Sequence, residues 1–278
     1  MCKAILISGC STGIGLKTAE VLQARGYQVI ASCRRENDIE NLKARGLKHV
    51  IQLDVACSTS IDRAIESALS LCDGKLFALF NNAGFGQPGA LEDVSREVLR
   101  QQFETNVFGV HELTQKLIPT FLRQGDARII QHSSILGLLG MSGRGAYCAS
   151  KYALEGLTDV MRLELRNTPI KISLIEPGPI LSDFRKNSLL ALKQNIDIEN
   201  SRHRALYEAA ITRMETEGPA MPFTLPAGAV TKRVIRILES RNPKPRYYVT
   251  TPTYFLSAMK RILPHRAFSA LVGKLEKA

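Results

Sequence analysis

The stretch KAILISGCSTGIGLKTAE, residues 3–20, joins an apolar run to a helical pattern through a turn that contains Gly9, Gly13 and Gly15. Glycines at a strand-to-helix turn let the backbone approach a pyrophosphate, which the free N–H groups of the helix N-terminus then stabilise. The spacing differs from the Gly-x-Gly-x-x-Gly dinucleotide pattern, and a glycine cluster is also typical of an ordinary tight turn. Its place between the first strand and the first helix favours dinucleotide binding.

Similar apolar runs recur along the chain and alternate with helical patterns. They lie at residues 3–8, 27–32, 49–53, 76–80, 127–132 and 170–176, with a seventh candidate at 246–250. Strands that alternate with helices predict a parallel sheet covered on both faces. We therefore expect one α/β domain over residues 1–278, a Rossmann-type doubly wound parallel sheet of about seven strands with a C-terminal helical extension.

Two segments depart from this alternation. Residues 182–226 are helix-prone and of mixed polarity, and insertions after late strands of such sheets usually cover the ligand crevice. We expect them to form a substrate loop. Residues 251–278 have the pattern of one or two amphipathic helices interrupted near Pro264, and we expect a helical tail there.

The formal net charge of +11 is concentrated near the C-terminus, where residues 231–278 hold 11 Lys or Arg against 2 Asp or Glu. Such a tail could contact nucleic acid or an anionic membrane surface. A solvated helix face is the favoured interpretation, because no nucleic-acid motif and no interleaved aromatic residues accompany the charge. We therefore expect no nucleic-acid partner and retain membrane-surface contact through the tail as a weak alternative.

The sequence has no run of eighteen apolar residues, and its N-terminus enters a strand pattern without the features of a signal peptide. We therefore expect no transmembrane segment and a cytoplasmic location. The six cysteines show no metal-ligand spacing, so we expect reduced, mostly buried thiols and no metal site.

Polar residues follow the second to fifth predicted strands, at the edge where doubly wound sheets bind ligands. Arg34 and Arg35 follow the second strand, where the ribose 2′ position of a dinucleotide would lie. An arginine can hold a 2′-phosphate, so this pair predicts NADP(H), although Glu36 and Asp38 also fit a surface charge cluster. The next three strand ends carry Asp54, Asn81-Asn82-Ala83-Gly84 and Ser133-Ser134.

The helical stretch GAYCASKYALEGL, residues 145–157, carries Tyr147 and Lys151 four positions apart. Residues at this spacing share one helix face, so a phenol and an ammonium could act on one ligand. The pair alone is weak evidence, because an ordinary surface pair has the same spacing.

Taken in their order, these motifs resemble the short-chain dehydrogenase/reductase family over residues 3–250. The resemblance rests on the glycine turn, NNAG, Asn106-Val-Phe-Gly, a serine thirteen positions before the tyrosine, Tyr-x-x-x-Lys and Pro177-Gly178. Within the family, NNAGFG, GRGAYCASKYALE and SLIEPGPI look most like bacterial NADP-dependent aldehyde reductases and the related hydroxysteroid and retinol dehydrogenases.

The resemblance implies catalytic roles for Tyr147 as the proton donor and acceptor, Ser134 as the partner of the substrate oxygen, Lys151 beside the tyrosine and Asn106 as the anchor of a relay water. A free phenol has a pKa of about 10, and a nearby cation favours the phenolate. The cofactor site that the resemblance implies has no metal, holds NADP and comprises Gly9, Ser11, Thr12, Gly13, Ile14, Gly15, Arg34, Asp54, Val55, Asn82, Ala83, Gly84, Tyr147, Lys151, Pro177, Gly178, Ile180 and Ser182.

The chain departs from the family pattern in two places. Ser11 and Thr12 stand where some NADP-preferring members carry a basic residue, which weakens the NADP prediction. Ser182 stands where a threonine is frequent after Pro-Gly, and it keeps the hydroxyl.

The sequence therefore predicts an NADP(H)-dependent oxidoreductase that reduces aldehydes or ketones, with Tyr147 as general acid. The alternatives are a hydroxysteroid or retinol dehydrogenase with a longer apolar channel, and a non-catalytic NADP-sensing protein on the same fold. Phe85 and the stretch ILGLLGM at 135–141 favour a small apolar carbonyl or alcohol as substrate. Analogy with the family favours a homo-oligomer.

Overall fold

The computed structural model, described over residues 3–216, 218–219 and 221–277, contains a seven-stranded sheet in the order β3-β2-β1-β4-β5-β6-β9. All neighbouring strands are parallel, so the predicted fold class is confirmed. The strands are β1 (Ala4–Ile7), β2 (Gln28–Cys33), β3 (His49–Gln52), β4 (Leu76–Asn81), β5 (Ala127–His132), β6 (Ile170–Glu176) and β9 (Arg246–Tyr248).

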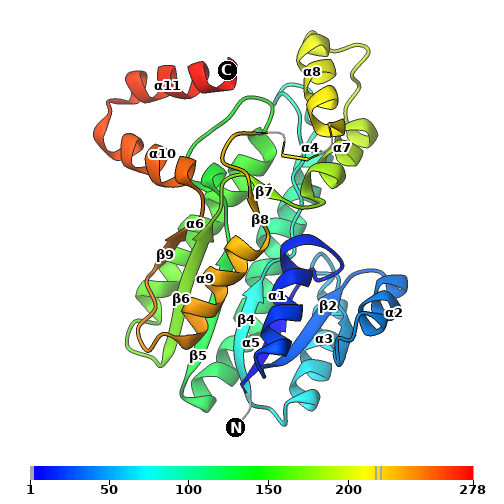
Figure 1. Cartoon of the computed structure of the whole chain (residues 1–278), viewed down its shortest axis with the longest axis vertical. Coiled ribbons are helices and arrows are strands. Elements are labelled where there is room, and N and C mark those ends of the chain that lie inside the picture. The colour runs from blue at the N-terminus through cyan, green and yellow to red at the C-terminus, as the bar shows by residue number, and fades with distance from the viewer. Residues whose placement is uncertain (1–2, 217, 220, 278) are drawn as a thin grey trace.

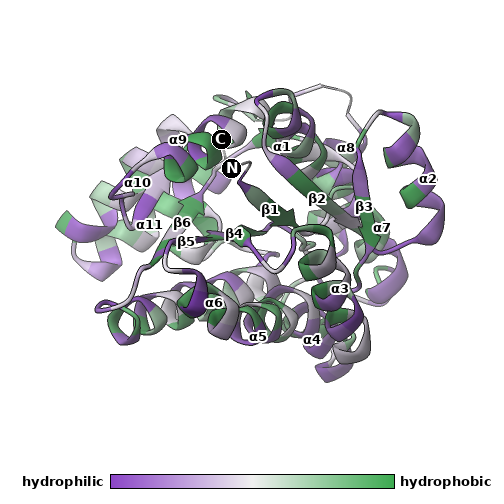
Figure 2. Cartoon of the chain, turned by 90° about the horizontal axis from the view of Figure 1, so that it is seen from below, coloured by the Kyte–Doolittle hydropathy of each residue, from purple (hydrophilic) through white to green (hydrophobic). Residues whose placement is uncertain are grey.

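Helices cover both faces of this sheet (Figures 1 and 2). Helices α1 and α9 lie on one side, and α3, α5 and α6 lie on the other (Figure 2). The helices are α1 (Gly13–Ala24), α2 (Glu36–Ala44), α3 (Ser58–Leu71), α4 (Arg96–Phe103), α5 (Gly109–Gln124), α6 (Gly145–Glu164), α7 (Phe184–Asn195), α8 (Arg204–Glu215), α9 (Gly228–Glu239), α10 (Thr251–Ile262) and α11 (His265–Lys277).

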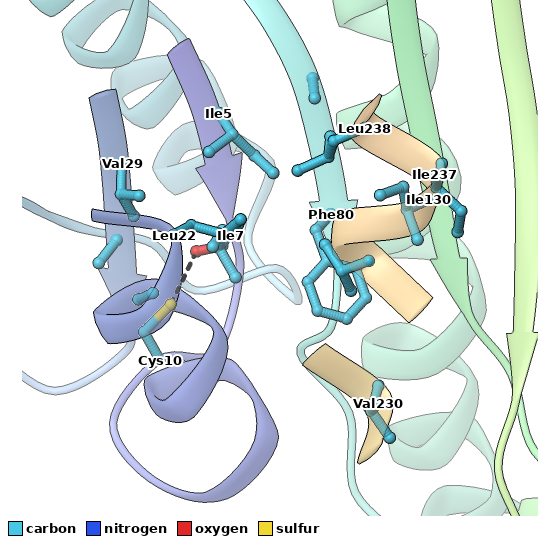
Figure 3. Packing of buried hydrophobic residues seen from close by; sticks show 14 of the residues in the cluster. Ile5, Ile7, Cys10, Leu22, Val29, Phe80, Ile130, Val230, Ile237 and Leu238 are labelled. Atoms are coloured by element: carbon cyan, nitrogen blue, oxygen red, sulfur yellow. Dashed lines mark hydrogen bonds between the residues drawn. The ribbon is translucent and has the colours of Figure 1, made fainter. Parts of the chain in front are cut away.

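The core follows from the alternation of side chains along the strands. On β1, Ile5 and Ile7 pack into the layer that holds Leu22 of α1 and Ile237 of α9 (Figure 3). Ala4 and Leu6 face the opposite layer, where α3 and α5 supply aliphatic side chains and Phe121. Because both faces are buried, the strands read as continuous apolar runs in the sequence.

The chain leaves β1 to build β2 and β3 on one side, and returns to build β4, β5 and β6 on the other. The switch point therefore lies between β1 and β4, where ligands of doubly wound sheets bind. Gly9 and Gly13 have φ angles of +71° and +60°, which glycine adopts without strain. A Cβ atom on Gly9 would lie 2.8 Å from Ala83 Cα, so the glycine turn packs directly on the end of β4.

The segment 182–226 and the C-terminal helices lie at the same end of the sheet (Figure 1). The segment forms α7 and α8 and is framed by a short parallel pair, β7 (Ile180–Leu181) with β8 (Leu225–Pro226). The last strand is shorter than the predicted 246–250, because Thr250 instead serves as the N-cap of α10. Helices α10 and α11 are separated at Leu263 and Pro264.

Four of the described cysteines, Cys10, Cys33, Cys72 and Cys148, are buried free thiols, and Cys57 is exposed. Cys2 lies outside the described residues. Among the helices of the described chain, none combines the length and apolar character needed to cross a membrane.

Candidate active site

The turn after β1 and the turn after β4 are fastened to each other by Ser8 and Asn82. The buried Ser8 hydroxyl oxygen accepts hydrogen bonds from the backbone N–H groups of Asn82 (3.0 Å) and Ala83 (2.9 Å). The Asn82 amide nitrogen donates to the carbonyl oxygens of Ser8 (3.0 Å) and Gly9 (2.9 Å). A Cβ atom on Gly15 would overlap the Gly9 carbonyl oxygen and crowd this amide, so glycine is required there.

The first turn of α1 fits the pyrophosphate of a dinucleotide. Thr12 is the N-cap of the helix, and its side chain makes no capping hydrogen bond. The first turn also contains no acidic side chain that would repel an anion. Backbone N–H groups at a helix N-terminus are the donors that a phosphate requires. Ser11, Thr12, Gly13, Ile14 and Gly15 thus form a fitting cradle.

His132, at the end of β5, connects Asn82 to Lys151. Its Nδ1 atom lies 3.0 Å from the Asn82 side-chain oxygen, while its backbone carbonyl accepts a 2.6 Å hydrogen bond from Lys151 Nζ. Since the Asn82 nitrogen already donates two bonds, its oxygen is the acceptor and His132 Nδ1 carries the hydrogen. Burial, aided by the nearby Lys151 charge, lowers the pKa of His132 to about 3, so the imidazole is neutral.

Tyr147 and Lys151 lie on one face of α6, as their spacing predicts, and both side chains are buried. The Lys151 ammonium is 5.7 Å from the centre of the Tyr147 ring. Burial raises the pKa of Tyr147 to about 12, and a side-chain hydrogen bond with Ser134 opposes that shift. Burial lowers the pKa of Lys151 to about 8, and the charge of Glu155 opposes that shift. Near neutrality the phenol therefore holds its proton beside a cation.

Asn106 lies in the π-helix η1 (Glu104–Phe108), where an extra residue in the turn is a feature often found at functional sites. Its side-chain oxygen accepts from Phe85 N–H (3.1 Å), and its nitrogen donates to Phe85 O (2.9 Å) and Ser150 Oγ (3.2 Å). Ser150 Oγ donates to Tyr147 O (2.8 Å). The amide ties the turn after β4 to α6, while its role as a water anchor stays a prediction.

Ser134 follows β5 and is the N-cap of a short 3₁₀-helix, η2 (Ile135–Gly137), with its oxygen accepting from Leu136 N–H at 3.1 Å. The next residue, Ile135, donates its N–H to Pro177 O (2.8 Å), which joins the turns after β5 and β6. Gly178 has no room for a side chain, because a Cβ atom there would overlap the Thr250 hydroxyl. The structure thus brings Ser134 and Tyr147 together beside Pro177 and Gly178.

The remaining predicted cofactor residues lie along the same edge of the sheet. Arg34 is exposed at the end of β2. Asp54 lies beyond β3, where one side-chain oxygen accepts from Ala56 N–H (3.0 Å), and Val55 beside it is buried. Ile180 belongs to β7, and Ser182 Cβ would be 3.2 Å from a Cβ atom on Gly13. Arg34 and Asp54 thus follow β2 and β3, on the opposite side of β1 from the strand end that carries Ser134.

Residues that the sequence analysis did not identify also contribute. Phe184, the first residue of α7, packs against Tyr147 with 5.3 Å between the ring centroids and a tilt of 59° between the rings, so the 182–226 segment reaches the site. Ser8 and His132 hold the loops together, and Glu155 acts on Lys151. Of these residues, His132 could have been noticed in the sequence, because it is a titratable residue at the end of a predicted buried strand and directly precedes Ser133-Ser134.

A phosphate cradle, a switch point and a buried Tyr–Lys–Ser group define a nucleotide-dependent dehydrogenase or reductase. Residues 3–192 match the family model described as short chain dehydrogenase. The protein therefore belongs to the short-chain dehydrogenase/reductase family of oxidoreductases, and the resemblance seen in the sequence is confirmed.

The relatives agree with this assignment. The chain is 41% identical over 272 residues to the uncharacterized oxidoreductase YbbO of Escherichia coli K12, covering 98% of this chain and 94% of that protein. It is 38% identical over 198 residues to human retinol dehydrogenase 8, covering 68% and 62% of the two chains. A short-chain dehydrogenase from Streptomyces avermitilis superposes with a TM-score of 0.77 at 25% identity, over 100% of this chain and 97% of that chain.

We predict that His132 makes the fold sensitive to acid. Its pKa is lowered in the folded state to about 3, so the unfolded chain binds the proton first as the pH falls below about 6.5. The stability that the neutral ring contributes is present above that pH and is lost on acidification, by at most about 1.4 kcal/mol per pH unit. His132→Gln keeps an amide donor and should lose this dependence.

Urea unfolding at several pH values measures the effect. His111→Gln is the matched control, because His111 is exposed on α5 and its loss should leave the pH dependence unchanged. Equal pH dependence in wild type and His132→Gln would show that His132 is not the acid-sensitive group.

Proposed function

We propose that the protein is an NADP(H)-dependent oxidoreductase that reduces apolar aldehydes or ketones to alcohols, with Tyr147 as the general acid. The observation that carries the proposal is the buried phenol of Tyr147, which keeps its proton at neutral pH between the Lys151 ammonium and the Ser134 hydroxyl. A group that donates a proton in the transition state typically accelerates a reaction about 10²–10⁴-fold.

In the proposed mechanism NADPH, when bound, supplies the hydride for the carbonyl carbon. Ser134 donates a hydrogen bond to the carbonyl oxygen and Tyr147 transfers its proton to that oxygen. Lys151 stabilises the phenolate that remains, since a cation close to a phenol favours its ionised form. The charge of Lys151 matters because burial, the largest cause, raises the pKa of Tyr147 to about 12 even though the Ser134 hydrogen bond opposes it, and that pKa is too high for ready proton exchange in both directions.

The proposed preference for NADP(H) rests on Arg34 and Arg35, which follow β2 and are exposed. A guanidinium forms two parallel, charge-assisted hydrogen bonds to a phosphate, whereas a ribose hydroxyl carries no charge and cannot accept such a pair. Ser11 and Thr12 add no basic group in the glycine turn. We therefore assign the discrimination to the end of β2.

Changing Arg34 to Ala should weaken NADPH binding by about 1.5–3 kcal/mol, the range of a charged hydrogen bond, and leave NADH binding nearly unchanged. Fluorescence titration with both cofactors measures this. Lys43→Ala is the control, because Lys43 is an exposed residue of α2 whose partner is Glu40. A wild type that prefers NADH would contradict the assignment.

Tyr147→Phe keeps the ring and its contact with Phe184 but removes the acid, so turnover should fall by at least about 100-fold while NADPH still binds. Tyr152→Phe is the matched control on the same helix: Tyr152 is 41% exposed and its hydroxyl accepts from Lys260. Near-normal turnover in Tyr147→Phe would remove Tyr147 from the mechanism.

The proposed substrate is a neutral, apolar carbonyl compound. Phe184 packs on Tyr147, and a Cβ atom on Gly86 would press against the Phe184 ring, so the wall beside the phenol is aromatic. Apolar walls with few polar groups favour apolar ligands. The similarity to human retinol dehydrogenase 8 supports the alternative of a retinol or hydroxysteroid dehydrogenase.

The specificity constant kcat/KM with NADPH along a series of linear aldehydes, beside retinal and a steroid ketone, tests the substrate class. Each buried CH₂ contributes about 0.8 kcal/mol, so KM should fall at most roughly fourfold per carbon until the pocket is filled. A kcat/KM that stays constant or falls as the aldehyde chain lengthens would contradict an apolar pocket. A much higher value for retinal or the steroid would favour the alternative, and no turnover with any carbonyl would favour an NADP-sensing protein.

We further propose a cytoplasmic homo-oligomer. Leu157, Val160 and Leu163 are exposed on the outer side of α6, with Leu163 67% exposed, and apolar residues gathered on one helix are typical of interfaces. Light scattering of the purified protein measures the assembly, and a monomer at all concentrations would contradict this part of the proposal.

A further inference from the structure

A cluster of three carboxylates surrounds Arg246, the first residue of β9, behind the Tyr147–Lys151 pair. Arg246 Nη1 contacts both Glu155 Oε2 of α6 and, at 2.6 Å, Glu176 Oε1 at the end of β6. Arg246 Nη2 contacts Asp159 Oδ2 at 2.7 Å. The side chains of Glu176 and Glu155 are 0% and 8% exposed, whereas that of Asp159 is 46% exposed.

The charges of this cluster do not balance if every carboxyl group is ionised. Asp159 is partly exposed to solvent and has a second partner, since Arg162 Nη1 lies 2.9 Å from Asp159 Oδ1. Glu155 and Glu176 are buried and share a single nitrogen of one guanidinium. Like charges this close disfavour each other's ionisation, and burial adds to the cost.

The free oxygens of the two glutamates differ in their surroundings. Glu176 Oε2 is buried and has no hydrogen-bond partner among the described residues, whereas Glu155 Oε1, which is also buried, makes no hydrogen bond of good geometry but has the Ser133 hydroxyl nearby, which lowers the pKa of Glu155 against the effect of burial. A carboxylate oxygen in this state is costly, and protonation of one carboxyl group relieves both the repulsion and part of the desolvation. Burial first, and the charge of Glu155 second, raise the pKa of Glu176 to about 8. Glu176 is thus the member of the pair that holds the proton.

Glu155 connects the cluster to Lys151, since it follows Lys151 by one helical turn on α6. Its charge opposes the lowering of the Lys151 pKa by burial. A Cβ atom on Gly137 would lie 3.0 Å from Glu155 Cγ, so the loop that begins at Ser134 packs tightly over this carboxyl group. The charged groups that act on the pair are Lys151 and Asp159 of α6 and Arg246 of β9, and Arg162 of α6 in turn binds Asp159.

We propose that Glu155 and Glu176 share one proton at neutral pH, with Glu176 as the carboxylic acid and Glu155 as the carboxylate. Ionised Glu155, oriented by Arg246, is then a positioning residue that keeps Lys151 in its ammonium form. The consequence for catalysis rests on the function proposed above for Lys151, whereas the protonation states do not.

Infrared difference spectroscopy of the cofactor-free protein at pH 7 tests the shared proton. Wild type should show a protonated carboxyl band that is absent in Glu176→Gln and present in Asp159→Asn, the control at the exposed side of Arg246. Absence of the band in wild type, or its loss only in Glu155→Gln, would overturn the assignment.

NMR titration of ¹³C-labelled lysine in the cofactor-free protein tests the action on Lys151. Removing a carboxylate one turn away should lower the Lys151 midpoint by about one pH unit in Glu155→Gln, and Asp159→Asn should change it little. In alcohol oxidation, the rate increase that accompanies Tyr147 ionisation should move to higher pH in Glu155→Gln alone. An unchanged Lys151 midpoint would overturn the positioning role.

Unfolding measurements keep the proposal testable if Glu155→Gln folds poorly. The folded pKa of Glu176 lies above its unfolded value, so the stability from the neutral acid is present at low pH and is lost as the pH rises towards about 8. As the pH rises from about 5 to 8, the melting temperature of wild type should therefore fall relative to that of Glu176→Gln. A difference in melting temperature that stays constant with pH would contradict the shared proton.

If the protein reduces no carbonyl compound, the proposed function fails. The infrared, NMR and unfolding measurements still decide the protonation states.

Discussion

The site depends on the close contact between two turns, one after β1 and one after β4. Because Gly9 and Gly15 have no side chains, the Asn82 amide reaches the carbonyl oxygens of Ser8 and Gly9. From Asn82 the hydrogen bonds continue through His132 to Lys151. The phosphate cradle and the ammonium beside Tyr147 are therefore held by one chain of contacts across three strand ends. A side chain at Gly15 would disturb this whole arrangement.

Burial in this site opposes the chemistry that the residues suggest. It raises the pKa of Tyr147 to about 12 and lowers that of Lys151 to about 8, since a low dielectric disfavours both charged forms. The site offsets these shifts with Ser134 beside the phenol and Glu155 below the ammonium. Desolvated charges interact more strongly with a reacting group than hydrated ones, so the buried arrangement suits proton transfer.

Most of the fold and the centre of the site could be predicted from the sequence, because their signals are local. Buried parallel strands appear as apolar runs, and Tyr147 and Lys151 share a helix face through their spacing. Arg246 and Glu155 are separated by 91 positions, and Phe184 reaches Tyr147 only through the fold of the 182–226 segment. The spacing of residues within one helix or strand does not predict such long-range contacts. His132 was missed for the same reason, since its partners Asn82 and Lys151 come from other elements.

The two segments that depart from the strand–helix alternation act on opposite sides of the same centre. Phe184 of α7 packs against Tyr147, while Phe268 and Val272 of α11 pack with Leu139 from the loop that follows Ser134. Glu276 of α11 further accepts the Ser142 N–H at 2.6 Å. A change in either segment therefore alters the surroundings of Tyr147 or of Ser134, and the 182–226 segment also meets the glycine turn, since Ser182 lies against Gly13. The sheet thus holds the Tyr147–Lys151–Ser134 group in place, while the two outer segments form the walls around it.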